Sequence, residues 1–280
     1  MIKKITFIII ILFCASCSNS NENLVSNSSS NFDEALNLFE NKKYLRAKSE
    51  FEFLIFNNPG SKRAILSQFY YSECLFYLND YNEAIKQYEK FISISTDSKL
   101  ITISKFLICK AYFNLSQEYY KDQTDTRIAI NKCQSFIEEF SLLDDVQFEI
   151  HDISVNLIFE CEEMIKKLRA KLSKKNLESG KLYLRIEKYD AAIEYFNLIL
   201  TEFYDSPYID DAIYHIVLIN LLQNNQSTAE RFLKLYEKDF IDSEKLKNTK
   251  KLFDSIKFNK NNYNYIIGIL IGTYMLNLSL

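Results

Sequence analysis

Apolar residues recur every three or four positions along most of this chain, which is the period of an amphipathic helix. The clearest stretch covers residues 177–203 and predicts two such helices joined by a tight turn. Gly180 stands on the first predicted helix, and Tyr189, Ala192 and Phe196 share one face of the second. Small residues let two antiparallel helices approach closely, while aromatic rings fill the space beside them. The stretch therefore predicts one tightly packed helix pair.

The same pattern recurs elsewhere in the chain. An aromatic residue opens the second helix, an alanine follows three residues later and another aromatic residue seven residues later, as in tetratricopeptide repeats. The repeat alanines are Ala47, Ala84, Ala129, Ala192 and Ala229. The first interval and the last are close to the ~34 residues of the ideal repeat. With no alternating strand pattern present, the sequence predicts an all-α fold: a tetratricopeptide-repeat solenoid of about five helix pairs over residues 32–258.

Acidic residues precede two of the predicted helices. Asp144 and Asp145 are expected to cap the N-terminus of one helix, where carboxylates accept the unpaired backbone amides. Asp122, Asp125 and Thr126 are expected to do the same for the helix that carries Ala129.

The N-terminus has the pattern of an export signal. A short basic start is followed by an apolar run over residues 5–13, too short to remain as a spanning helix, and then by Ala15 and Ser16. Cys17 follows these small residues, which resembles a bacterial lipoprotein box. Residues 1–16 are therefore predicted to be a lipoprotein signal peptide, with Cys17 as the lipid-bearing N-terminus. The alternative is an ordinary signal peptide followed by a coincidental cysteine.

The two ends of the mature chain differ in composition from its centre. Residues 17–31 consist almost wholly of Ser and Asn after the cysteine, so they predict a flexible tether. Residues 259–280 form a C-terminal tail that is tyrosine-rich and then apolar from residue 263 onward, and the uncharged run over residues 263–280 is shorter than the ~20 residues of a membrane span. This tail is expected to cap the solenoid, with a partner contact or a membrane contact as alternatives.

Several classes of function are disfavoured. The net charge is −3, with Lys and Arg dispersed rather than gathered in a basic stripe, which disfavours nucleic acid as a partner. His151 and His215 each stand apart on a predicted helix, and neither a metal-binding pair nor a glycine-rich phosphate loop is present in the sequence. The sequence therefore predicts no enzyme, no cofactor and no bound metal.

Four cysteines lie beyond the predicted lipidation site. They are Cys74, Cys109, Cys133 and Cys161. Each stands among apolar residues of a predicted helix, so we expect buried thiols that pack as small apolar side chains rather than disulfides.

Aromatic residues on the first helices of the repeats form a candidate binding surface. First helices line the concave face of such a solenoid, and Phe39, Tyr77 and Tyr112 fall there. A row of aromatic rings could hold an extended peptide, so these three residues are predicted to form a peptide-binding groove. The alternative is that they only pack between repeats, which is the favoured interpretation for Phe69 and Phe76.

One stretch resembles a known family. Residues 168–172 run into Gly180, Tyr183 and residues 188–192, and the stretch closes with residues 204–207, Tyr-Asp-Ser-Pro. Together with the lipoprotein cysteine, the polar tether and the repeats, this layout resembles the BamD family of tetratricopeptide-repeat lipoproteins in the outer-membrane β-barrel assembly machinery.

The resemblance implies a non-catalytic scaffold, lipid-anchored to the outer membrane and facing the periplasm. In that family the N-terminal repeats would hold peptides of unfolded barrel proteins. The C-terminal repeats would dock the POTRA domains of the large barrel subunit, without nucleotide or metal. The alternative function is a tetratricopeptide-repeat lipoprotein that coordinates cell-wall or Tol–Pal-type envelope complexes. The tail after residue 258 departs from the family pattern.

Overall fold

The computed structural model describes residues 31–143, 146–151 and 153–258, and these residues are predominantly helical. Residues 31–40 are helical and precede the labelled elements. Those elements are α3 (Tyr44–Asn57), α4 (Lys62–Tyr77), α5 (Tyr81–Ile94), α6 (Ser98–Leu115), α7 (Thr124–Glu139), η2 (Ser141–Leu143), β1 (Gln147–Ile150), β2 (Ile153–Asn156), α8 (Leu157–Arg185), α9 (Tyr189–Glu202), α10 (Ile209–Leu222), α11 (Gln226–Tyr236), η3 (Glu237–Asp239) and α12 (Ser243–Phe258). The predicted all-α repeat fold is confirmed. The predicted signal peptide, Cys17, the tether and the C-terminal tail lie outside the described residues.

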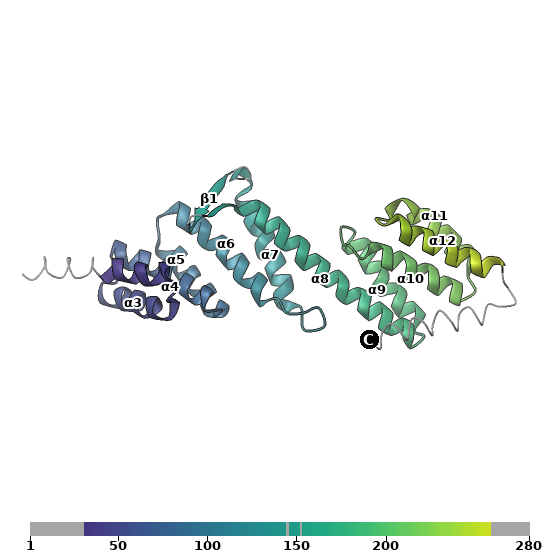
Figure 1. Ribbon diagram of the computed structural model, residues 1–280, viewed down its shortest axis with the longest axis horizontal. Coiled ribbons are helices and arrows are strands. Elements are labelled where there is room, and N and C mark those ends of the chain that lie inside the picture. The colour runs from purple at the N-terminus through teal and green to yellow at the C-terminus, as the bar shows by residue number, and fades with distance from the viewer. Residues whose placement is uncertain (1–30, 144–145, 152, 259–280) are drawn as a thin grey trace, which may run out of the picture. The chain divides into compact units, whose positions relative to one another are not determined.

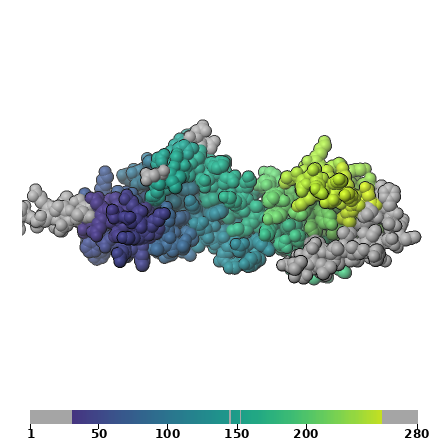
Figure 2. Space-filling model, in the orientation of Figure 1, coloured from purple at the N-terminus to yellow at the C-terminus, as the bar shows by residue number. Residues whose placement is uncertain are grey.

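Two compact units divide the chain, with boundaries inside α7 and α8. The first unit contains the described residues up to Leu115 together with Ser135–Cys161. Within it α3 packs on α4, α4 on α5 and α5 on α6. Its N-terminal core is built around Phe39, Phe51 and Cys74. In space-filling view, the purple and blue atoms of its helices pack closely (Figure 2).

The second unit contains Ser116–Gln134 and the described residues from Glu162 onward. Helix α10 lies at its centre and contacts α9, α11 and α12 (Figure 1). The core gathers apolar residues of α9, α10 and α11, with Leu252 and Phe253 of α12. Because α10 contacts three helices, nearly all of its residues are buried, including Asp210, His215 and Asn220.

The two helices of the fourth repeat, α8 and α9, pack closely where a small residue of one faces an aromatic ring of the other. A Cβ atom built on Gly180 of α8 would lie 2.6 Å from Cε1 of Phe196 on α9, closer than real Cβ contacts. Phe196 and Ala192 are fully buried, and Tyr183 stacks on Tyr195 at 5.3 Å beside them. The role predicted for Gly180 and Phe196 in pairing these helices is therefore confirmed.

The turn between the two helices of a repeat has the same backbone form four times. One residue in each turn adopts a left-handed conformation, with φ near 60°, and none of them is glycine. They are Lys42, Asn79, Glu187 and Asn224. In the first turn the Lys42 N–H donates to the Phe39 carbonyl and the Lys43 N–H to the Leu38 carbonyl, and the other three turns repeat both bonds. This pair of bonds is the Schellman motif, which satisfies the last carbonyls of the first helix.

A short β-hairpin stands where the sequence predicts only helix. Strands β1 and β2 pair antiparallel, with Phe148 opposite Val155 and Ile150 opposite Ile153 (Figure 1). Strands of four residues alternate too briefly to be distinguished from a helical pattern. The prediction that the chain lacks strands is therefore wrong for this segment.

The hairpin also changes the expected helix caps. A strand rather than a helix follows Asp144 and Asp145, which themselves lie outside the described residues. Helix α8 begins only at Leu157, and the Asn156 side chain accepts the Phe159 N–H at 2.9 Å. The predicted cap at residues 144–145 is therefore wrong, because the helix starts after the hairpin.

Helix α7 has the acidic start that the sequence predicts. The Asp122 carboxylate accepts the Thr124 N–H at 3.1 Å, and Asp125 lies in the first turn. Thr126 departs from the prediction, because its hydroxyl donates to the Gln123 side chain at 2.8 Å.

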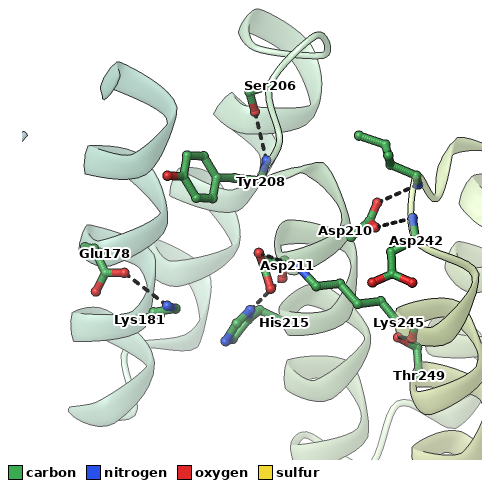
Figure 3. Close-up of polar contacts among 11 residues, drawn as sticks. Glu178, Lys181, Ser206, Tyr208, Asp210, Asp211, His215, Asp242, Lys245 and Thr249 are labelled. Carbon is green, nitrogen blue, oxygen red and sulfur yellow. Dashed lines mark hydrogen bonds and ion pairs between the residues drawn. The ribbon is translucent and has the colours of Figure 1, made fainter. Parts of the chain in front are cut away.

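Polar side chains join α10 to the start of α12 (Figure 3). The buried Asp210 carboxylate accepts the backbone N–H groups of Ile241 at 2.9 Å and Asp242 at 2.8 Å. Asp211 pairs with Lys245 at 3.0 Å. The two backbone N–H groups replace the water that the Asp210 carboxylate loses on burial, and these bonds fix the loop before α12.

His215 is buried beneath this region. Its ring stacks on Phe196 at 4.9 Å. Its Nδ1 donates to the Asp211 carbonyl (Figure 3). Burial lowers the pKa of His215 to about 4; the Asp211 carbonyl bond opposes this shift, and the charge of Lys181 adds to it. The ring is therefore neutral at pH 7. The prediction that His215 lies on a helix is confirmed.

Burial of the cysteines agrees with the sequence, since Cys74, Cys109, Cys133 and Cys161 are all buried. None of the helices in the described part of the chain is both long enough and apolar enough to cross a membrane.

Overpacking the fourth repeat should destabilise the protein. Gly180→Leu adds methylene groups against Phe196, and Ala192→Leu adds them at a fully buried position, so each is expected to reduce the free energy of unfolding by about 1–3 kcal/mol. The exposed neighbour Lys188 provides a control, because Lys188→Gln should change that free energy by less than ~0.5 kcal/mol. Urea unfolding at pH 7 measures all three variants. Equal losses from the leucine variants and the control would show that the Gly180–Phe196 contact does not hold the helices together.

His215 should make stability depend on pH between about 6.5 and 4. The unfolded state binds a proton at a higher pH than the folded state, so stability is present above pH 6.5 and decreases as the pH falls. For His215→Phe, which keeps a ring against Phe196, unfolding free energy relative to wild type should rise by about 2 kcal/mol from pH 7 to pH 5. Urea titrations of both proteins at the two pH values give this difference. Parallel pH profiles would contradict a buried neutral His215.

Candidate functional site

Two of the three predicted groove residues lie together in the first unit. Phe39 is buried at the end of the first helix, and Tyr77 ends α4 with 41% of its surface exposed. Their ring centroids are 5.9 Å apart in an edge contact. Tyr112 lies two helices further along the chain, half-buried on α6. The groove remains a prediction; Phe39 and Tyr77 are in contact, but only Tyr77 is partly exposed.

Tyr44 completes an aromatic cluster with these two rings. It stacks on Tyr77 at 4.7 Å with the planes 9° apart, and its centroid lies 5.4 Å from that of Phe39. The turn at Lys42 brings Phe39 and Tyr44 together, because it reverses the chain between them. Tyr77 comes from the next repeat. We call Phe39, Tyr44 and Tyr77 the aromatic cluster.

A buried carboxylate lies beside the aromatic cluster. Glu73 is one turn before Tyr77 on α4, and only 2% of its side chain is exposed. Its Oε1 is 2.8 Å from His151 Nε2, while its Oε2 is buried without a hydrogen-bond partner among the described residues. Burial raises the pKa of Glu73, and the hydrogen bond and charge of His151 oppose the rise. A buried carboxylate with one unsatisfied oxygen is unusual and marks this position as a candidate site.

His151 reaches this carboxylate from the tip of the hairpin. It precedes β2, and its backbone is left-handed with φ of 49°. Its ring centroid lies 5.2 Å from Phe39 and 6.0 Å from Tyr77, and 34% of its side chain is exposed. The prediction that His151 stands apart on a helix is wrong, because the hairpin replaces that helix and brings the ring to Glu73.

The side chains at the aromatic cluster are suited to binding a ligand. Burial, together with the charge of Glu73, raises the pKa of Tyr77 to about 12, and the pKa of the Cys74 thiol rises to about 12 for the same reasons. Tyr77 and Cys74 therefore stay protonated at neutral pH and are poor nucleophiles. What the cluster offers a ligand is apolar ring surface and a single carboxylate.

Sequence reasoning missed Glu73, Tyr44 and the role of His151. A signal for Glu73 was present, since it is one carboxylate in a run of apolar and aromatic residues, residues 69–78. Tyr44 was identified only as the aromatic residue that opens a repeat helix. The contact with His151 joins residues 78 positions apart, so no local pattern could reveal it.

A second polar feature, in the second unit, explains the stretch that resembles the BamD family. The Arg169 guanidinium pairs with the Asp205 carboxylate at 2.7 Å and also donates to the Glu202 carbonyl at 2.7 Å. Ser173 and Ser206 share a hydrogen bond of 2.7 Å beside them. The matched residues thus clasp α8 to the loop after α9, which is a structural role.

A small pocket lies next to this clasp. It has a volume of about 280 Å³ and is lined by residues that include Arg127, Arg169 and Phe203. Arg169 faces Asp205, which holds the pKa of the guanidinium above its ordinary value, so its charge is already compensated. The pocket is small for a ligand site, since such sites usually measure about 300–1,000 Å³.

The chain matches proteins of the bacterial outer membrane. The family model described as "YfiO: Outer membrane lipoprotein" matches residues 26–235. The "Outer membrane protein assembly factor BamD" of Rickettsia prowazekii (strain Madrid E) is 21% identical over 220 residues, which cover 78% of this chain and 82% of that protein.

Solved structures with some likeness include two whose similarity spans most of both chains. A "MamA RS-1 ArsTM double mutant" has a TM-score of 0.33 at 10% identity, covering 81% of this chain and 97% of that chain. A "thermophilic TPR protein" of Thermus thermophilus has a TM-score of 0.30 at 15% identity, covering 82% of this chain and 99% of that chain. Scores this low support no conclusion about function. The family match covers most of the chain and shows that this chain belongs to the YfiO family of outer membrane lipoproteins.

Proposed function

We propose that this protein is a non-catalytic scaffold for the assembly of outer-membrane β-barrel proteins. The observation that carries the proposal is the family match over residues 26–235, and the Rickettsia relative named as an assembly factor supports it. A solenoid of helix pairs suits such a role, because it offers an extended surface to peptide partners.

The two units would serve different partners. The aromatic cluster of the first unit supplies exposed ring surface for segments of unfolded barrel proteins. The second unit would dock the POTRA domains of the large barrel subunit. Lipidation of Cys17 would anchor the protein to the outer membrane, with residues 18–31 as a tether that lets the repeats face the periplasm.

Co-purification tests the proposal against its alternative. Full-length protein with a C-terminal tag, extracted from its own membranes in mild detergent, should retain a large β-barrel protein that carries POTRA domains. Mass spectrometry identifies the retained proteins. Recovery of cell-wall or Tol–Pal-type proteins in its place would favour the envelope-coordination alternative and contradict the proposed function.

The aromatic cluster should matter for peptide binding in proportion to its exposure. Tyr77 is partly exposed, so Tyr77→Ala is expected to weaken binding of an unfolded barrel-protein peptide about thirtyfold, roughly 2 kcal/mol, with little change in stability. Phe39 is buried, so Phe39→Ala should instead reduce the unfolding free energy by about 3–5 kcal/mol. Tyr112→Ala tests whether the groove extends to α6. Fluorescence anisotropy and urea unfolding are measured on the same samples.

Phe56→Ala is the matched control, because Phe56 on α3 is an aromatic residue of the same unit with 82% of its surface exposed. It should change neither quantity. If Tyr77→Ala lowers stability while its affinity for the peptide stays that of wild type, the aromatic cluster belongs to the core and does not bind peptides.

A further inference from the structure

We propose that Glu73 and the aromatic cluster form a receptor for one basic side chain, lysine or arginine, of an extended peptide, and that His151 occupies this receptor in the free protein. The inference rests on the proposed function to the extent that both place a peptide on the same surface. It adds the chemical identity of one recognised side chain, and it gives the hairpin a role.

The carboxylate of Glu73 is the first argument. Burying an ionised carboxylate is unfavourable unless a cation or several hydrogen-bond donors compensate for the lost water. Oε1 has such a donor in His151 Nε2, at 2.8 Å, whereas Oε2 has none among the described residues. An ammonium carries three donors and a guanidinium five, so either could satisfy both oxygens, which one imidazole nitrogen does not.

The rings supply the second argument. Cations are attracted to aromatic rings when they lie within about 6 Å of the ring centroid. The His151 ring lies 5.2 Å from the Phe39 centroid and 6.0 Å from the Tyr77 centroid, so a group in its place meets both rings and the carboxylate. Tyr44 stacks on Tyr77 at 4.7 Å and so supports one of these two rings. Rings around a single carboxylate recognise an organic cation better than a hydrated metal ion, which prefers several oxygen ligands.

The charges around the aromatic cluster disfavour an anionic ligand. Burial is the main cause of the raised pKa values of Tyr44, Tyr70 and Tyr77, and the charge of Glu73 adds to the rise at each of them. The charge of Glu73 therefore reaches Tyr44 and Tyr77 of the aromatic cluster, and it opposes an added anion there. A peptide's terminal carboxylate is thus disfavoured at this position, and the recognised residue is basic.

The hairpin can give up its place at modest cost. It consists of two strands of four residues each, and an isolated two-stranded hairpin is marginally stable in water. His151 keeps 34% of its side chain exposed and has a left-handed backbone, a conformation that is unfavourable for a residue with a Cβ. Phe148 of β1 is buried, whereas His151 is partly exposed. The His151 side chain can therefore leave Glu73 while Phe148 stays buried.

A pair of peptides tests this directly. Two otherwise identical extended peptides carry either lysine or norleucine, its uncharged counterpart of similar length, at one central position. The lysine peptide should bind wild-type protein about tenfold more tightly, since a hydrogen bond to a charged group contributes more than a neutral contact. Glu73→Gln keeps the shape of the side chain and should abolish the difference between the peptides. His151→Ala should strengthen binding of the lysine peptide severalfold, because no imidazole has to be displaced.

NMR of the wild-type protein provides a readout that needs no variant. Binding of the lysine peptide should move the His151 imidazole resonances to the positions of a solvent-exposed histidine and leave those of the buried His215 unchanged. Equal affinities of both peptides for wild type and Glu73→Gln, with the His151 resonances unmoved, would overturn this inference and leave the proposed function standing. Failure of both peptides to bind would overturn the inference and the peptide-binding part of the proposed function together.

Discussion

The contact of a small residue on one helix with an aromatic ring on the next is the constraint on which the repeats depend. Phe196 occupies the space that any side chain at position 180 would need, so the two helices pack at the distance set by the ring. The same combination of a small residue and an aromatic residue occurs at Ala35 and Phe51 and again at Ser72 and Tyr88. All four residues are fully buried. The ring in turn positions the next layer, since Phe196 stacks on His215 of α10.

The helices were predictable because this constraint is local. Tyr189, Ala192 and Phe196 lie within two turns of one helix, so their spacing in the sequence already describes their common face. The BamD-like stretch was recognisable for the same reason, and Arg169 with Asp205 shows that what it specifies is a clasp between helices.

The hairpin and the candidate site could not be predicted in this way. Strands of four residues carry too few alternations to compete with the surrounding helical pattern, and the segment was assigned to helix. His151 and Glu73 meet only because the hairpin folds back on α4, a relation set by tertiary structure. Phe39 and Tyr77 were identified from their place on the first helices of the repeats, whereas Glu73 was not singled out.

The left-handed turns at Lys42, Asn79, Glu187 and Asn224 have a consequence for how the repeats fold. The stability of a solenoid is approximately the sum of what each repeat contributes by itself and what each interface adds. A residue with a Cβ in a left-handed turn reduces the first of these contributions, where glycine would leave it intact. Repeats weakened in this way rely more on their neighbours, so unfolding within each unit should be cooperative and repeats should not fray one at a time.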